Sequence, residues 1–433
     1  MEGPLEDDTK DIYELDMAHI IDTLWSRFQS LDIIGKRALK SKVCEGYRLS
    51  CFVAPCQPPS PFAPPLPHAH TAPPPNAEQS LHVRVRIVES YHLVLCQSKN
   101  FIINSTSSAT TSAETSGSLS EVEKIKQKCL KWKWKDQYSI NYFVSSDSDS
   151  SQPNHPPLLL VHGFGASIPH WRRNIKTLSQ NYTVYAIDLL GFGLSDKPPG
   201  FSYTMETWAE LILDFLDEVV KKPAVLIGNS VGSLACLIAA ASGNIQPDSS
   251  QTFVKGIVLL NCSGGMNNKA IVDDWRIKLL LPLLWLIDFL LNQKGIASAI
   301  FERVKQRENL RNILSSVYGN KESVDDELVE IIREPANSEG ALDAFVSIVT
   351  GPPGPNPVQL VPKISLPILL LWGDEDPFTP IDGPVGKYFS SLPSQQENVK
   401  LFLLEGVGHC PHDDRPELVH EKLLPWLATL SNA

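Results

Sequence analysis

Cysteine is scarce in this chain, and the few cysteines follow no pattern. The 433 residues include 8 cysteines at irregular spacing, which argues against a disulfide framework and favours a reducing compartment. Basic charge is also in deficit, because 38 Lys and Arg stand against 49 Asp and Glu for a net charge of -11. A nucleic-acid binder needs a basic surface, so this balance argues against that class of function.

Long hydrophobic runs are missing as well. The longest apolar stretch, 279–291, is interrupted by one aspartate and is shorter than the roughly 20 residues that span a bilayer. Three cysteines and two histidines between 44 and 70 match no paired ligand spacing of a zinc site. We therefore expect neither a structural metal nor a transmembrane helix.

The N-terminal part has the composition of an unstructured segment. Residues 55–75 contain ten prolines, and residues 105–120 contain eleven Ser and Thr. Such segments bury too little apolar surface to offset the entropy lost on folding, so we predict a largely disordered extension over 1–125, with one candidate strand at 82–88. Its acid-poor, serine-rich stretch follows an acidic start. It is either an organelle transit region behind an extra extension or a plain disordered tail.

From residue 126 to 433, short apolar runs alternate with helical patterns. Alternating aromatic and aliphatic residues over 132–144, around a Lys-Asp-Gln turn, predict an opening hairpin. Alternation of strands and helices predicts right-handed crossovers and a mostly parallel, doubly wound α/β sheet. Six apolar runs suit strands buried on both faces of that sheet: Leu158–Val161, Thr183–Ile187, Ala224–Ile227, Gly256–Leu260, Ile368–Trp372 and Lys400–Leu404.

The interval 262–350 interrupts this alternation and is predicted to be a helical cap inserted between two strands. Helical patterns cover Ile277–Leu291, Ile300–Leu314 and Asp325–Ile332. The first pattern is apolar nearly all round, so we expect that helix to be buried or to line an apolar cavity.

A Gly-Asn-Ser-Val-Gly sequence at 228–232 follows a predicted strand and leads into a helix of small residues. The motif alone occurs by chance, but strand, sharp turn and helix together are the setting of a nucleophile elbow. Glycines let the strand and helix approach each other around a strained serine backbone. We predict Ser230 as a nucleophile; the alternative is an ordinary strand–helix turn with an incidental serine.

A serine hydroxyl needs a general base, and the base needs an orienting acid. Candidates for both follow the last two predicted strands, whose carboxyl ends share one edge of a parallel sheet. We assign His409 as the base, with His412 as the runner-up. Three other histidines fit less well by position: His162, His170 and His420.

For the acid we prefer Asp376 to Asp374 and Glu375. The ring of Pro377 restricts the backbone that precedes it and helps to hold the loop at Asp376. The other two carboxylates lie closer to the strand and suit a turn or the surface.

The oxyanion of an acyl transfer needs hydrogen-bond donors aimed at it. We assign these donors to the backbone N–H groups of Val231, after the nucleophile, and of Phe164, in the His-Gly-Phe-Gly loop after the first parallel strand. A phosphate cradle is the alternative for that loop, but its glycine spacing matches no phosphate-binding motif. Asp188, after another strand, is interpreted as a structural turn residue.

Five motifs together resemble the α/β-hydrolase superfamily, over about 130–430: the 162–165 loop, Asp188-x-x-Gly-x-Gly-x-Ser, the serine motif, Trp372-Gly-x-x-Asp and Gly408-His409. Within it, Gly-Asn-Ser-x-Gly, the Phe164 loop and the apolar insertion are similar to the plant chlorophyll dephytylase and pheophytinase branch. Ser233 departs from the pattern, because many members carry a further glycine there.

This resemblance implies hydrolysis of the phytyl ester of chlorophyll-type pigments in the chloroplast, at the thylakoid; a cytoplasmic location is the alternative. A phytyl ester joins a long branched alcohol to a flat macrocycle, so a long apolar pocket is expected. Leu281 and Trp285 are candidates for its wall. The same helix could instead lie on a membrane surface as a peripheral contact, or simply pack the cap onto the core.

We therefore predict a serine carboxylesterase that acts on a lipophilic ester through an acyl-enzyme, with no metal, cofactor or nucleic-acid partner. A general lipase or acylglycerol esterase is one alternative. A ligand receptor that keeps the triad but turns over slowly is another. The sequence leaves the oligomeric state open.

Overall fold

The computed structural model describes residues 119–145, 155–243, 253–267 and 285–431. Gly117–Ala433 forms one compact unit. Of the disordered extension predicted over 1–125, only 119–125 are described, and the candidate strand at 82–88 lies outside the described residues. The predicted disorder is wrong for 121–125, because helix α2 (Glu121–Gln127) begins there and buries Val122 and Ile125. Within the described ranges, no helix combines the length and the apolar character needed to cross a bilayer.

The predicted opening hairpin is confirmed. Strands β1 (Cys129–Trp134) and β2 (Tyr138–Val144) pair antiparallel. Lys135 and Asp136 both have positive φ, 51° and 55°, which gives the turn the twist that matches the two strands. Trp134 is buried at the end of β1, and its indole N–H donates at 2.7 Å to Asp214 of helix α4 (Met205–Phe215).

An eight-stranded sheet forms the centre of the unit, in the order β1-β2-β4-β3-β5-β6-β7-β8. β2 pairs antiparallel with β1 and β4, and the remaining neighbours are parallel, which confirms the predicted mostly parallel sheet. The other strands are β3 (Leu158–Val161), β4 (Val184–Ile187), β5 (Ala224–Asn229), β6 (Val254–Leu260), β7 (Ile368–Gly373) and β8 (Val399–Leu404).

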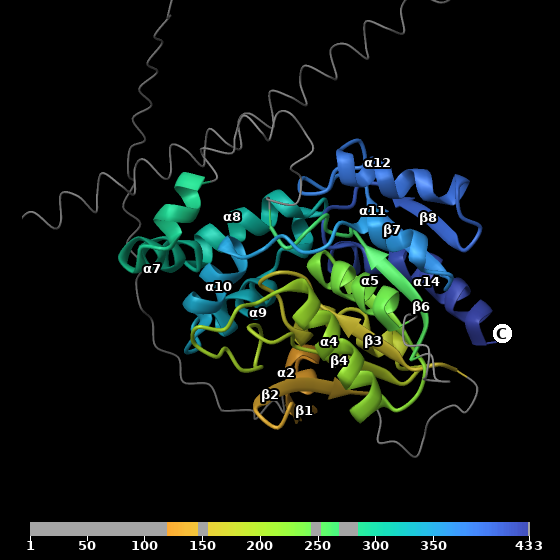
Figure 1. The fold of residues 1–433 in the computed structure, drawn as a ribbon, viewed down its shortest axis with the longest axis horizontal. Coiled ribbons are helices and arrows are strands. Elements are labelled where there is room, and N and C mark those ends of the chain that lie inside the picture. Colours follow the sequence, from red (N-terminus) through yellow and green to blue (C-terminus); the bar gives the residue numbers. More distant parts are fainter. Residues whose placement is uncertain (1–118, 146–154, 244–252, 268–284, 432–433) are drawn as a thin grey trace, which may run out of the picture. The chain divides into compact units, whose positions relative to one another are not determined.

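The central strands are apolar throughout because both faces of the sheet are covered. Leu159 belongs to a core shared with α4 (Met205–Phe215) and α5 (Val231–Gly243), which lie side by side along the sheet (Figure 1). Its neighbour Leu158 faces the opposite core, shared with α3 (Ile175–Leu178) and α14 (Pro416–Ser431). Full burial of each such aliphatic side chain stabilises the fold by roughly 1.5–3 kcal/mol.

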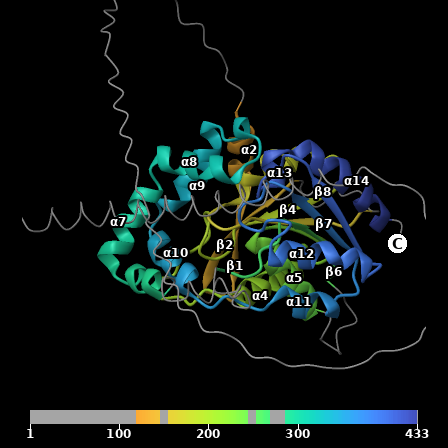
Figure 2. The same ribbon diagram turned by 90° about the horizontal axis from the view of Figure 1, so that it is seen from above.

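The cap is helical, as predicted, but its divisions differ. Residues 285–291 of the cap are helical. Four further helices follow, α7 (Lys294–Val304), α8 (Arg307–Val317), α9 (Asp326–Ala336) and α10 (Ala341–Thr350), and they gather at one end of the unit in both views (Figures 1 and 2). The single helix predicted over 300–314 is wrong. Lys305 caps α7, and Gln306 takes an extended conformation before α8. Because of this bend, Phe301 of α7 and Leu310 of α8 are both buried. In one straight helix the two side chains would point in different directions.

Short elements complete the unit. The first, helix α2, begins with a capping box formed by Ser120 and Glu123. They are α2 (Glu121–Gln127), η1 (Ile168–Trp171), η2 (Leu216–Val220), η4 (Lys321–Ser323), α11 (Pro357–Leu360), η5 (Val361–Lys363), α12 (Pro384–Ser391), η6 (Leu392–Ser394) and α13 (Pro411–Asp414).

Candidate active site

Ser230 occupies the sharp turn between β5 and α5. Its φ is 55°, a left-handed conformation that is strained for a residue with a side chain. Its N–H donates to Leu260 O at 3.0 Å, and its own carbonyl accepts from Leu234 N at 3.2 Å. These bonds from β6 and α5 hold the strained turn, and they give the serine the geometry of a nucleophile elbow.

Glycine at 232 is required by close packing. A Cβ there would lie 2.3 Å from His162 O and 2.5 Å from Val161 O, well inside the van der Waals limit. The first turn of α5 therefore presses directly on the end of β3. This approach brings the 162–165 loop against the serine.

Ser233, which departs from the family pattern, strengthens the elbow. Its hydroxyl donates to Gly228 O at 2.6 Å and accepts from Leu260 N at 3.1 Å. The side chain is fully buried and joins α5 to both β5 and β6. A glycine at this position would leave Gly228 O and Leu260 N without this hydrogen-bond partner.

His409 and Asp376 form a buried pair. His409 Nδ1 lies 2.7 Å from Asp376 Oδ2, and the two residues follow β8 and β7 at the same edge of the sheet. A carboxylate at Nδ1 holds the proton on that nitrogen and leaves Nε2 to accept a proton. The structure thus pairs Asp376, rather than Asp374 or Glu375, with His409.

Several donors surround the Asp376 carboxylate. Thr379 donates through both its N–H, at 3.1 Å, and its hydroxyl, at 2.5 Å, while Asn261 Nδ2 donates at 2.7 Å. Burial alone raises the pKa of this carboxyl, but the charge and hydrogen bond of His409 and the Thr379 bonds outweigh burial and lower the pKa to about 2. Asp376 therefore stays ionised at neutral pH.

Asn229 ties the histidine loop to the elbow. Its Nδ2 donates to His409 O at 2.9 Å and to Leu260 O at 3.2 Å. Because Asn229 directly precedes Ser230 in the chain, this bond anchors the backbone of His409 beside the nucleophile. The Ser230 hydroxyl makes no hydrogen bond to other described residues, so its bond to His409 Nε2 is not formed in this structure; such bonds are often long in free enzymes and tighten with substrate.

The 162–165 loop lies against the nucleophile. A Cβ on Gly163 would lie 3.2 Å from Ser230 Cβ. The His162 ring links the loop to the residues after β4, since its Nδ1 is 2.7 Å from Gly163 O and its Nε2 accepts from Leu189 N at 3.1 Å. Burial lowers the pKa of His162, which keeps the ring neutral for this arrangement.

Two backbone N–H groups at this loop and elbow remain free. Across the described ranges, neither Phe164 N nor Val231 N donates a hydrogen bond. Val231 is the first residue of α5, where the helix dipole favours negative charge. Both groups are therefore available to an oxyanion.

The other predicted candidates have different surroundings. His412 Nε2 faces His170 Nδ1 at 3.3 Å, and burial holds the pKa of His412 well below its usual range. Asp188 accepts from Ile168 N at 2.7 Å and from Leu194 N at 2.8 Å, as a turn-forming residue does. His420 Nε2 lies 3.1 Å from Asn174 Oδ1, so this histidine does not take part in the His409–Asp376 pair.

Sequence reasoning missed Asn229, Asn261 and Thr379. Asn261 has positive φ, 42°, and is fully buried directly after β6. Asn261 is a polar residue that directly follows a buried strand, and that strand pairs with β7, which precedes Asp376. This position is the sequence signal that could have identified it. Thr379 lies three residues after Asp376, the spacing of a local side-chain turn.

Aromatic rings flank the polar centre. Phe378 is 60% exposed and lies edge-on to His409 at 5.0 Å, while Phe164 is 41% exposed and contacts Phe345 of α10 at 6.1 Å between ring centres. Trp285 is 75% exposed and Phe289 is 62% exposed, whereas Leu291 is buried, so the described part of the helix predicted at 277–291 is buried only at its end. Leu281 lies outside the described residues, and the substrate-binding roles of both residues stay predictions.

Metal-binding side chains do not gather in the described part of the chain: no group of three or more His, Cys, Asp or Glu is placed to hold an ion. The polar groups of the site instead pair with one another.

A model of the alpha/beta hydrolase fold matches residues 156–416. The chain belongs to the alpha/beta hydrolase fold family. This membership confirms the predicted superfamily and fold. The matched range contains the serine elbow, the cap, Asp376 and His409.

This hydrolase is similar in sequence to two curated proteins, one bacterial and one from a plant. It is 29% identical over 279 residues to the uncharacterized hydrolase YugF of Bacillus subtilis, which covers 64% of this chain and 91% of that protein. It is 27% identical over 341 residues to the chloroplastic pheophytinase of Arabidopsis thaliana, covering 69% of this chain and 66% of pheophytinase. The second match therefore spans just under two thirds of that relative.

A solved structure resembles the hydrolase over most of its fold. A membrane phospholipase A described as a bacterial virulence factor aligns with a TM-score of 0.52 and 25% identity, covering 71% of this chain and 88% of that one.

Proposed function

We propose that the protein is a serine carboxylic-ester hydrolase of a lipophilic substrate. The observation that carries the proposal is the Asp376–His409 pair at 2.7 Å, anchored through Asn229 beside the strained Ser230. Nucleophile, base and acid follow three parallel strands whose carboxyl ends meet at one edge. A base oriented by an ionised carboxylate is what a serine hydroxyl needs for attack.

In the proposed reaction, Ser230 Oγ attacks the ester carbonyl while His409 Nε2 takes its proton. Asp376 stabilises the imidazolium that results, and the N–H groups of Val231 and Phe164 hold the oxyanion. His409 then gives the proton to the departing alkoxide oxygen, which leaves as the alcohol. A water molecule, deprotonated by the same base, releases the acid from the acyl-enzyme.

As the substrate we favour the phytyl ester of a chlorophyll-type pigment, which would place the protein in the chloroplast. The similarity to pheophytinase supports this choice, and the exposed rings of Phe164 and Phe378 beside the polar centre suit an apolar ligand. The contact of Phe378 with His409 would put apolar substrate groups next to the base.

An acyl-lipid esterase is the second candidate. The likeness to a membrane phospholipase A favours it, and the same exposed rings would suit a fatty-acyl chain. Purified protein should be assayed side by side on chlorophyll a, pheophytin a, a triacylglycerol and a phosphatidylcholine. Release of phytol from the pigments supports the first candidate, whereas fatty acid from the lipids supports the second.

Replacement of Ser230 by alanine should abolish turnover of whichever ester is cleaved. The variant removes the nucleophile but leaves the buried pair His409–Asp376, so the protein should fold and lose at least about 10³-fold in kcat. Circular dichroism should match that of the wild type. Steady turnover by Ser230→Ala would exclude the mechanism, and a wild-type burst followed by negligible turnover would favour a ligand receptor.

A further inference from the structure

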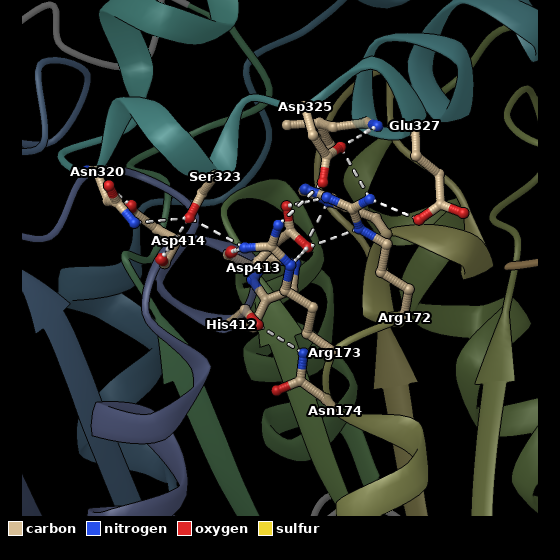
Figure 3. A network of polar contacts seen from close by, with 12 residues as sticks. Arg172, Arg173, Asn174, Asn320, Ser323, Asp325, Glu327, His412, Asp413 and Asp414 are labelled. Carbon is tan, nitrogen blue, oxygen red and sulfur yellow. Dashed lines mark hydrogen bonds and ion pairs between the residues drawn. The ribbon is translucent and has the colours of Figure 1, made fainter. Parts of the chain in front are cut away.

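Two neighbouring buried carboxylates, Asp413 and Asp414, follow His409 in α13, and they have different partners. Asp413 accepts from Arg172 Nε at 3.1 Å and from the Tyr318 hydroxyl at 3.1 Å. Asp414 instead bonds backbone N–H groups. Figure 3 shows Asn320 and Ser323 of the cap reaching toward Asp414, with the two arginines gathered at Asp413.

The Asp414 carboxylate bridges the loop that carries the base and the cap. Oδ2 accepts from Gly408 N at 2.7 Å, directly before His409, and from Gly319 N at 2.8 Å, just beyond α8. Oδ1 accepts from Asn320 N at 2.9 Å. Three charge-assisted bonds from two chain segments therefore converge on one side chain.

The two segments also touch directly. His409 N donates to Val317 O at 2.9 Å. A Cβ on Gly408 would lie 2.0 Å from the same oxygen, and a Cβ on Gly319 would lie 2.2 Å from Gly406 O. Such contact means that a displacement of residues 317–320 displaces the backbone of the histidine loop.

We propose that Asp414 is a positioning residue that aligns His409 by fixing its loop to the cap segment 317–320. The inference rests on the proposed serine mechanism. His409 is held on one side by Asn229 and Asp376, which belong to the sheet edge, and on the other by the cap through Asp414. The position of the base consequently depends on the cap segment, and not on the sheet alone.

The test compares Asp414→Asn with Ser323→Ala in the full chain. Asparagine has nearly the same shape, but its amide NH2 cannot accept the N–H groups that one carboxylate oxygen now serves. Ser323→Ala is the control, because it removes the cap bond to the Asp414 carbonyl (2.9 Å), together with the bonds that the hydroxyl accepts from Arg173 and from Asn320 Nδ2, and leaves the three N–H bonds to the Asp414 carboxylate in place. A fluorophosphonate that labels the active serine counts the competent sites in each preparation.

With rates expressed per labelled site, Asp414→Asn should lower kcat about 10-fold to 100-fold, the range expected for a misplaced catalytic group, while KM changes less than about 2-fold. The proton NMR signal of His409 Nδ1–H, bonded to Asp376, should shift or broaden. Ser323→Ala should change neither kcat nor the signal. A loss of stability alone would lower the number of labelled sites, but not the rate per site.

A second variant approaches the same bond from the cap. Asn320→Pro removes the N–H that Asp414 Oδ1 accepts, and the φ of -84° at this position is close to that of proline. It should lower kcat per site by about 5-fold if the cap helps to align the base. Unchanged kcat and an unchanged histidine signal in whichever of the two variants folds would overturn the proposal. Absence of labelling and turnover in the wild type would instead contradict the serine mechanism itself.

Discussion

At the scale of single residues, the acid of the site combines burial with ionisation. Asp376 is nearly inaccessible, yet its pKa is lowered from 3.8 to about 2 by the histidine and Thr379 against the effect of burial. A carboxyl whose folded pKa is depressed stabilises the protein above its unfolded pKa. That stability is lost as the pH falls through the folded pKa.

Asp376→Asn should therefore show a pH-dependent difference from the wild type. The shift corresponds to about 2 kcal/mol of unfolding free energy, present above about pH 4 and lost between about pH 4 and 2. Urea unfolding of both proteins at steps from pH 6 to 2.5 measures it. A difference that already shrinks near pH 6 would contradict the depressed pKa. At neutral pH the same variant should lose about 10³-fold to 10⁴-fold in kcat.

At the scale of elements, one hydroxyl connects a helix with two strands. Ser233 Oγ bonds Gly228 O of β5 and Leu260 N of β6 from its place on α5. Ser233→Ala leaves a buried N–H without this acceptor, which should lower the free energy of unfolding by about 1–3 kcal/mol. Urea unfolding at neutral pH measures the loss.

The control for this change is Ser316→Ala on α8, whose exposed hydroxyl donates to the carbonyl of Ile313. That substitution should alter stability by less than about 0.5 kcal/mol. Equal effects of the two substitutions would show that the bridge from α5 to the strands contributes nothing. Because Ser233 does not touch the substrate in the proposed reaction, kcat per labelled site should be retained.

At the scale of the whole unit, a buried ion pair joins parts that are distant in the chain. Arg172 follows η1, Asp413 lies beside the histidine loop, and Glu327 of α9 completes the group at 2.7 Å from Arg172. Among the described residues, Arg172→Met would leave the buried Asp413 carboxylate with the Arg173 side chain and the Tyr318 hydroxyl as its partners. We expect a loss of about 3 kcal/mol in unfolding free energy.

Chemical denaturation measures this loss, and two further variants interpret it. Arg172→Met combined with Asp413→Asn should regain part of it, because the buried carboxylate that lost its Arg172 partner is then uncharged. Arg307→Met, which breaks a half-exposed pair with Glu330, should cost about 1 kcal/mol or less. If Arg172→Met were as mild as Arg307→Met, the buried ion pair would contribute no more to stability than a half-exposed one.

Much of the architecture was readable from local patterns. The ends of the six predicted parallel strands lie within two residues of the observed ends, and five of them have the predicted apolar interior positions because a strand buried on both faces must be continuously apolar. The prediction of burial on both faces is wrong for 400–404, because β8 is an edge strand of the sheet and exposes Phe402 and Leu403. The cap helices were less predictable: the break at Lys305 and Gln306 follows from how two buried side chains reach the core, which periodicity over 300–314 does not encode. Helix α10 was not predicted, although its buried residues Ala341, Ala344 and Ile348 recur at helical spacing.

The sequence by itself determined the family, the order of the strands' motifs and the identity of Ser230, Asp376 and His409 as candidates, since each follows directly on a recognisable strand. Only the tertiary structure decided which carboxylate meets which histidine, and it alone revealed Asn229, Asn261 and the bridge of Asp414. The contacts of Asp376 with His409 and Asn261, and of Asn229 with His409, join residues that are 33 to 180 positions apart. Their geometry depends on strand register and helix packing, which no local pattern specifies.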